Sequence, residues 1–176
     1  MFTDDWRLSA MKEISLDKFE FSPFNKIAKD WMLVSAGTPE SCSTLTASWG
    51  GVGVLWGKNV VFSFIRPQRH TLEFIDQEDY FSITFLKDGY RDALNYCGSH
   101  SGGENQKITE AGLHLAEFKE APIFKEASLT FICKKLYRQP LEPKYLLDQT
   151  LDERWYPNKD YHNMFVGEIV HVFSND

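Results

Sequence analysis

Seven short segments of the chain are rich in β-branched and aromatic residues, and several of them alternate apolar and polar positions with a period of two. Such runs are typical of β-strands, whose successive side chains point to opposite faces of a sheet. The segments cover residues 31–37, 43–49, 59–65, 80–86, 113–118, 127–137 and 164–173. The pattern therefore predicts a domain built on seven strands.

Helical spacing of apolar residues is brief by comparison. It covers residues 71–77, 89–97 and 104–112, and Pro23 after Ser22 favours a further short helix from about residue 23. The strands do not alternate regularly with long helices, so a doubly wound sheet is disfavoured. The fold class that we predict is mainly β, an antiparallel, Greek-key-like barrel with short helical insertions.

Two stretches interrupt this pattern. The glycines of "WGGVGVLWG" (49–57) are expected to break the second strand, to bend the chain and to let a ligand approach the backbone. Residues 139–163 contain three prolines and four aromatic rings and are too long for a simple connection. We expect this stretch to be a lid or an arm that reaches another subunit.

Length and charge limit the possible classes of protein. With 176 residues, 43% of them hydrophobic, the chain is long enough for one well-buried core, so we expect a single domain over residues 1–176 with an N-terminal extension over 1–29. The net charge of −6 repels polyphosphate, and nucleic acid is not expected as a partner.

The cysteines and the first residues indicate the cellular compartment. Three cysteines at wide spacing, with no C-x-x-C pair and no histidine at zinc-finger spacing, predict reduced thiols in a cytoplasm and no metal site. The segment "MFTDDWRLSAMKE" lacks the order of a signal peptide, and no apolar run approaches the roughly 20 residues of a membrane span. No membrane association is expected.

The most cationic candidate for a site is the turn "RPQRHT" (66–71). Arg66 and Arg69 flank Pro67, and the hydroxyl of Thr71 stands where it could cap the following helix, so these groups could converge on one anion such as a terminal phosphate. The alternative is a solvated basic loop whose arginines pair with acidic side chains.

Three other segments are weaker candidates when each is taken alone. "CGSHSGGENQK" (97–107) could offer backbone donors and a cation, although such clusters are usually turns. "TLTASWGG" (44–51) could meet the edge of a planar heterocycle, with Trp49 as a wall, or could simply be a barrel strand. His162, before the last strand, could touch a cofactor or donate a proton, or be a structural histidine.

Taken together and in this order, these segments resemble the flavin reductase family, which has the FMN-binding split-barrel fold. The resemblance covers roughly residues 30–172. It is strongest at "KDWMLVSAG", "STLTASWGGVGVLWGKNVVFSFIRPQRHT", "CGSHSG" and "DYHNMFVGEI". "NYCGSHSG" departs from the commoner family pattern. The ordered set is far more specific than any one segment.

The resemblance implies roles for individual residues. Those implied to lie against the isoalloxazine ring are Thr46, Ala47, Ser48 and Trp49, with His162 near the ring. Those implied to hold the FMN phosphate are Arg66, Arg69 and Thr71. Those implied to lie near the phosphate or the partner subunit are Ser99, Ser101 and Lys107. A local cluster of cations would then hold a dianionic phosphate on an otherwise acidic chain.

The resemblance also implies a function and an assembly. Bound FMN would accept hydride from NADH or NADPH and pass electrons to free flavin or another acceptor, in a homodimer with flavin near the interface. Because the cofactor carries the redox chemistry, no catalytic acid or base beyond a possible role for His162 is required. No G-x-G-x-x-G fingerprint is present, so the dinucleotide would bind without a Rossmann site.

Two other functions remain open at this point. One is a flavoredoxin-like FMN electron carrier that a protein partner reduces. The other is a flavin-free barrel that acts as an interaction module and gains no thermal stability from added FMN.

Overall fold

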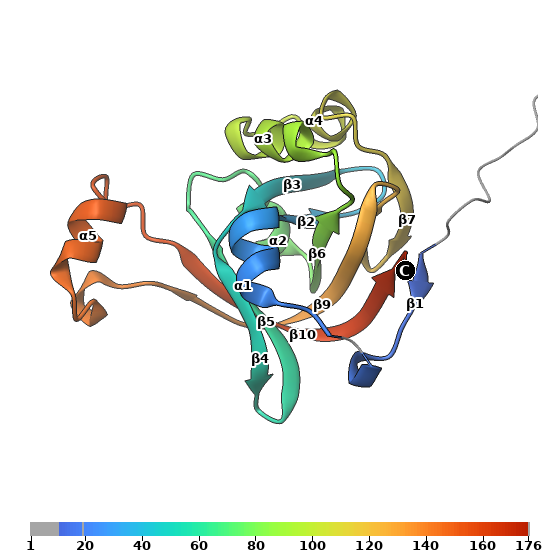
Figure 1. Cartoon of the computed structure of the whole chain (residues 1–176). Coiled ribbons are helices and arrows are strands. Elements are labelled where there is room, and N and C mark those ends of the chain that lie inside the picture. Colours follow the sequence, from blue (N-terminus) through green and yellow to red (C-terminus); the bar gives the residue numbers. More distant parts are fainter. Residues whose placement is uncertain (1–10, 19, 176) are drawn as a thin grey trace, which may run out of the picture.

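The computed structural model describes residues 11–18 and 20–175. The N-terminal extension expected over residues 1–29 is therefore described only in part, and the segment tested above for a signal peptide lies largely outside the described residues. Within the described ranges the architecture is a curved antiparallel sheet, accompanied by a small two-stranded sheet and surrounded by short helices (Figure 1).

The main sheet has eight strands in the order β3-β2-β6-β9-β10-β5-β4, with β1 paired to β10. Its strands are β1 (Lys12–Glu13), β2 (Met32–Gly37), β3 (Cys42–Ala47), β4 (Gly50–Leu55), β5 (Lys58–Ile65), β6 (Tyr80–Leu86), β9 (Ala127–Pro140) and β10 (Asn163–Ser174). A second, two-stranded sheet pairs β7 (Leu115–Lys119) with β8 (Ala121–Phe124). Every pairing is antiparallel, so the predicted fold class is confirmed.

The helices are short. They are α1 (Pro23–Asn25), α2 (Thr71–Gln77), α3 (Arg91–Ser99), α4 (Glu104–Glu110) and α5 (Gln149–Trp155), with single turns η1 (Leu16–Lys18), η2 (Lys26–Asp30) and η3 (Pro143–Tyr145). The predicted helices at 71–77, 89–97 and 104–112 are confirmed within two residues at each end. None of the helices in the described ranges has the length and apolar composition that a bilayer span requires.

Strand β2 shows why α3 and α4 cover the outer face of the sheet. All six of its residues are buried. Met32 and Val34 pack into the interior of the curved sheet, whereas Leu33 points outward and packs with Leu94 of α3 and Ile108 of α4. Because a strand buried on both faces needs a cover on each, α3 and α4 form the outer layer here.

Strand β4 was not predicted. Because glycine has a low strand propensity, the glycines of residues 50–53 predicted a break in the chain after the second strand, but Gly50–Leu55 pairs with β5 in a hairpin. The tip consists of Trp56 and Gly57, with φ values of 54° and 70°. Positive φ at both central residues suits a two-residue hairpin turn, and it is the glycine at the second position that makes this turn accessible. The short strands β1 and β8 were also not predicted.

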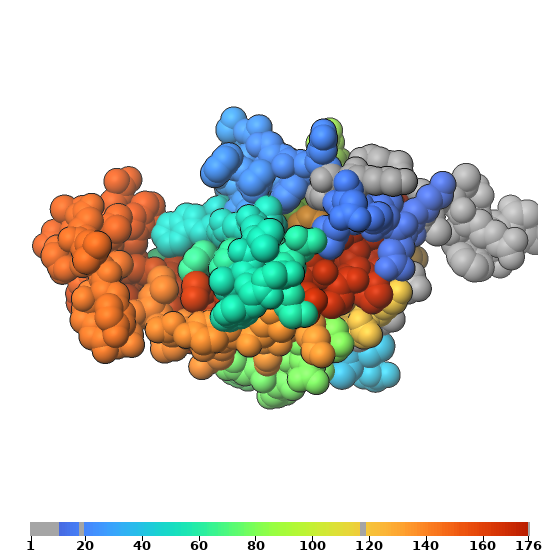
Figure 2. Space-filling model, turned by 90° about the horizontal axis from the view of Figure 1, so that it is seen from below, coloured from blue at the N-terminus to red at the C-terminus, as the bar shows by residue number. Residues whose placement is uncertain are grey.

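The long connection over residues 139–163, named the arm below, projects from the barrel. Strands β9 and β10 extend beyond the rest of the sheet, and η3 and α5 lie at the far end of the extension (Figure 1). Figure 2 shows the same segment in orange, standing out from the body of the molecule. Leu147 and Tyr145 on the arm are exposed.

Replacing Gly167 with alanine is expected to destabilise the fold. A Cβ at this position of β10 would lie 2.6 Å from Cζ of Phe81 and 2.9 Å from Cβ of Cys133, both in the buried core. Such overpacking costs about 1–3 kcal/mol, which urea denaturation of Gly167→Ala should report as a lower free energy of unfolding. At Gly53 the nearest atom would be 3.9 Å away, so Gly53→Ala should change that free energy by less than about 0.5 kcal/mol. Equal stability of the two variants would contradict this packing.

Candidate functional site

A pocket of about 200 Å³ opens where the ends of β3 and β5 meet the base of the arm. The register of β10 explains why these segments meet. Asn163 pairs with Ile65, so His162 and Arg66, each one residue beyond the pair, emerge at the same edge of the sheet. The lining residues are Leu45, Thr46, Ala47, Ser48, Trp49, Phe64, Ile65, Arg66, Arg69, Trp155 and His162.

Arg66 holds the arm against the barrel. One guanidinium nitrogen lies 2.5 Å from Oδ2 of Asp160, and the other donates to the carbonyl oxygen of Trp155 at 2.9 Å. The guanidinium also lies over the ring of Tyr156, 5.3 Å from its centroid. The positive charge of Arg66 is therefore neutralised within the chain, and its bonds fix the base of the arm.

Arg69 is in a different position. Its guanidinium donates to the carbonyl oxygen of Gly98 at 2.7 Å, and no carboxylate among the described residues lies within ion-pair distance of it. Burial, and then the nearby charge of Arg66, lower the pKa of Arg69 below its ordinary value. The pocket thus contains a half-buried positive charge without a protein counter-ion, and this favours an anionic ligand.

Aromatic rings form one wall of the pocket. The ring centroids of Trp49 and Trp155 lie 4.9 Å apart, edge to face, and the imidazole of His162 lies 5.2 Å from Trp49. Both tryptophans remain more than one third exposed. Rings with free surface beside a cation suit a flat ligand that carries an anionic group.

His162 is buried, and its Nδ1 lies 2.9 Å from the hydroxyl of Tyr156. Burial is the main cause that lowers the pKa of His162 to about 4, the charge of Arg66 lowers it further, and Asp160 opposes the shift. The imidazole is therefore neutral at pH 7, and it can act as a hydrogen-bond donor or acceptor without a full charge.

The strand end that carries Thr46 and Ser48 contributes hydroxyl groups. The hydroxyl of Thr46 donates to the carbonyl oxygen of Leu94 at 2.6 Å, which attaches the strand to α3. The hydroxyl of Ser48 has no partner in the described part of the chain. Ser48 lines this pocket and two neighbouring hollows, so it is available to a ligand there.

The structure brings seven of the predicted residues together at the pocket: Thr46, Ala47, Ser48, Trp49, Arg66, Arg69 and His162. Thr71 lies elsewhere. It is the first residue of α2 rather than its cap, and its buried hydroxyl pairs with that of Ser43 at 2.9 Å, so the predicted capping role is wrong. The N-cap position is occupied by His70.

The remaining predicted residues surround the pocket without lining it. Lys107 is 4% exposed, and its ammonium donates to the carbonyl oxygen of Thr44 at 2.7 Å. The hydroxyl of Ser99 donates to the carbonyl oxygen of Asn95 in its own helix. The geometry thus gives Lys107 and Ser99 protein partners rather than a direct place in the pocket.

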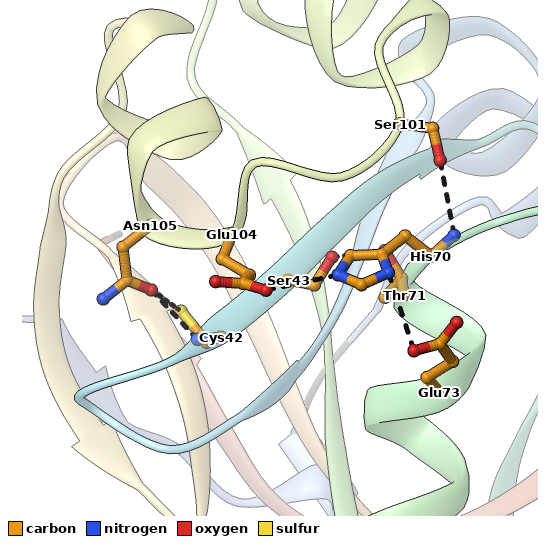
Figure 3. A network of polar contacts seen from close by, with 8 residues as sticks. All are labelled: Cys42, Ser43, His70, Thr71, Glu73, Ser101, Glu104 and Asn105. Carbon is orange, nitrogen blue, oxygen red and sulfur yellow. Dashed lines mark hydrogen bonds and ion pairs between the residues drawn. The ribbon is translucent and has the colours of Figure 1, made fainter.

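Ser101 belongs to a polar network beside the pocket, shown in Figure 3. Its hydroxyl accepts the backbone N–H of His70, whose ring lies between the carboxylates of Glu104, at 3.4 Å, and Glu73, at 3.7 Å (Figure 3). Ser101 and Arg69 share the lining of a second hollow of about 280 Å³. Ser101 therefore lines the neighbouring hollow, on the other side of Arg69, and does not line the pocket with the aromatic wall.

Four lining residues were not predicted: Leu45, Phe64, Ile65 and Trp155. The sequence singles out no particular ring of residues 139–163 for the site. Trp155 lies there because its carbonyl oxygen accepts a hydrogen bond from Arg66 and its ring packs edge to face on that of Trp49. No group of three or more histidine, cysteine, aspartate or glutamate residues in the described ranges is placed to hold a metal ion.

Comparison with known proteins identifies the family. Residues 24–176 match the model of the flavin reductase like domain, and the chain belongs to this family. The match covers most of the chain, so the family resemblance noted in the sequence is confirmed. No curated protein sequence matches the chain.

Solved structures share the fold at low sequence identity. An FMN-binding domain of a flavin reductases-like enzyme from Shewanella baltica OS155 superposes with a TM-score of 0.67 at 17% identity, covering 95% of this chain and 78% of that one. A flavoredoxin from Methanosarcina acetivorans gives 0.62 at 21%, covering 90% and 76%. An NADH:FAD oxidoreductase from Streptomyces globisporus C-1027 gives 0.59 at 17%, covering 81% and 74%. The fold is thus that of flavin reductase-like split barrels.

Proposed function

We propose that this protein is an FMN-binding oxidoreductase that takes hydride from NADH or NADPH and passes electrons to free flavin or another acceptor. The observation that carries the proposal is the guanidinium of Arg69, which has no counter-ion in the described residues and lies beside a partly exposed aromatic wall. FMN supplies the redox chemistry when bound, and the protein binds and orients it.

The donor set fits the two ends of FMN. Arg69 is suited to the phosphate, because a guanidinium forms charge-assisted hydrogen bonds with phosphate oxygens. Lys107 adds to the positive potential from outside the pocket: its pKa is lowered mainly by burial, and the nearby charge of Arg69 lowers it further. Trp49 and the neutral imidazole of His162 suit the flat ring.

The residues of the pocket bind and orient rather than react. No side chain in the described lining pairs a nucleophile with a base. Ser48 offers a free hydroxyl, and His162 offers an uncharged ring nitrogen to the polar edge of a heterocycle. This set is sufficient for an enzyme whose reaction takes place on the cofactor.

The size of the pocket supports assembly as a homodimer, with flavin near the interface. A volume of about 200 Å³ is below the range of about 300–1,000 Å³ that is typical for ligand sites. The exposed Leu147 and Tyr145 give the arm an apolar surface to bury. We propose that the arm packs on a second copy and that this copy completes the site.

A flavoredoxin-like electron carrier, reduced by a protein partner, is the second candidate. It is supported by the similarity to two flavoredoxin structures and by the lack of a dinucleotide-binding fingerprint in the sequence. A cytoplasmic location is proposed for either function, because Cys42, Cys97 and Cys133 are free and buried.

Anaerobic reduction distinguishes the two candidates. FMN-loaded protein mixed with NADH or NADPH under nitrogen should lose its flavin absorbance within seconds to minutes if the proposal holds, because the dinucleotide then reduces the flavin directly. The measurement is a stopped-flow or diode-array spectrum. Bleaching that needs an added protein fraction would favour the carrier.

Replacing Arg69 with alanine should separate binding from stability. A lost charge-assisted contact is worth about 1.5–3 kcal/mol, so the FMN dissociation constant should rise about ten- to a hundredfold. The melting temperature of the flavin-free protein should not fall, because the variant removes a charge that burial disfavours. Isothermal calorimetry and thermal melts give both values.

Arg138→Ala is the matched control for this experiment. Arg138 forms an ion pair with Asp76 and does not line the pocket, so its removal should leave FMN affinity unchanged. If Arg69→Ala bound FMN as tightly as Arg138→Ala, the phosphate would have to lie elsewhere.

A further inference from the structure

Tyr156 and His162 form a buried hydrogen bond where the arm joins the barrel. The phenol oxygen lies 2.9 Å from Nδ1 of the imidazole, and the two residues are 5% and 7% exposed. Tyr156 directly follows α5, and His162 directly precedes β10. The bond therefore joins the end of the arm to a residue of the pocket.

The surroundings of this bond determine which group donates. A buried hydroxyl whose proton has no acceptor costs free energy, and Nδ1 is the only side-chain acceptor within hydrogen-bond distance of the Tyr156 phenol among the described residues. The phenol therefore donates its proton to Nδ1. A ring nitrogen that accepts carries no proton, so the neutral imidazole must carry its proton on Nε2.

Burial is the main cause that keeps the ring neutral, and the charges of Arg66 and Arg69 act in the same direction. The carboxylate of Asp160, which pairs with Arg66, favours the charged imidazole but does not outweigh these causes. The proton on Nε2 is thus the only one on the ring at pH 7.

Nε2 itself remains available. It has no hydrogen-bond partner in the described part of the chain, and His162 lines the pocket beside Trp49. A donor held in this way suits an acceptor on a flat heterocycle, such as a carbonyl oxygen or a bare ring nitrogen.

We propose that Tyr156 is a positioning residue: its hydroxyl fixes His162 as the Nε2–H tautomer, so that the imidazole presents a hydrogen-bond donor to the ring of the bound ligand. The identity of that ligand as FMN rests on the proposed function. Because Tyr156 belongs to the arm, this donor is set only while the arm is seated on the barrel.

The first test needs no flavin. The full chain, labelled with ¹⁵N-histidine, is examined at pH 7.5 by long-range ¹H–¹⁵N correlation, and the signals of His162 are assigned by their loss in His162→Gln. In the wild-type protein Nδ1 should have the shift of an unprotonated nitrogen and Nε2 that of a protonated one. In Tyr156→Phe the Nδ1 shift should move towards the protonated value, because the ring is free to exchange its proton.

Tyr161→Phe is the matched control. Its phenol donates to Asp152 at 2.7 Å, and its ring lies 4.8 Å from that of Tyr156, so the variant removes a neighbouring hydroxyl without touching His162. The His162 shifts should stay as in the wild type. A protonated Nδ1 in the wild-type protein would overturn the proposal even if Tyr156→Phe failed to fold, as would unchanged shifts in a folded Tyr156→Phe variant.

Flavin binding provides the second readout. Loss of a fixed donor should raise the FMN dissociation constant of Tyr156→Phe about two- to tenfold, whereas Tyr161→Phe should match the wild type. Equal affinities of the two variants would overturn the claim that the donor reaches the ligand. If the wild-type protein bound no FMN, the proposed function would fail, while the nitrogen shifts would still decide the tautomer.

Discussion

Two guanidinium groups share one partly buried pocket, and the described residues provide a carboxylate for only one of them. Arg66 pairs with Asp160 and ties down the base of the arm. Among the described residues Arg69 has one hydrogen-bond partner, the carbonyl oxygen of Gly98, and burial, followed by the charge of Arg66, lowers its pKa. Retaining a charge in such a place is unfavourable for the protein alone, and it becomes favourable when an anion binds. The other features of the site follow from this division of roles.

The division depends on strand register. Pairing of Asn163 with Ile65 places His162 beside Arg66, and the hairpin of β4 and β5 places Trp49 next to them. A shift of one residue would turn each of these side chains to the opposite face of the sheet. The same register lets the end of the arm reach His162 through Tyr156. The same strand pairing therefore positions the charge of Arg69, the aromatic wall and the base of the arm.

Much of this arrangement could be predicted from local sequence. Alternation predicts the strands, and the basic turn itself predicts Arg69 as an anion ligand, whereas Ser48 is implied by the family resemblance. Local patterns could not show that Lys107 turns into the core towards Thr44, because the choice between a protein carbonyl and a ligand depends on packing between distant segments. For the same reason they could not assign separate roles to Arg66 and Arg69.

In the proposed complex the charge of Arg69, which no carboxylate of the described residues neutralises, holds the phosphate of FMN, while Trp49 after β3 and His162 before β10 contact its ring. A crystal structure of the FMN complex would decide whether it forms. We expect a phosphate oxygen within hydrogen-bond distance of the Arg69 guanidinium and an isoalloxazine ring in contact with Trp49 and His162. A phosphate bound elsewhere, with Arg69 still attached only to the carbonyl of Gly98, would contradict it.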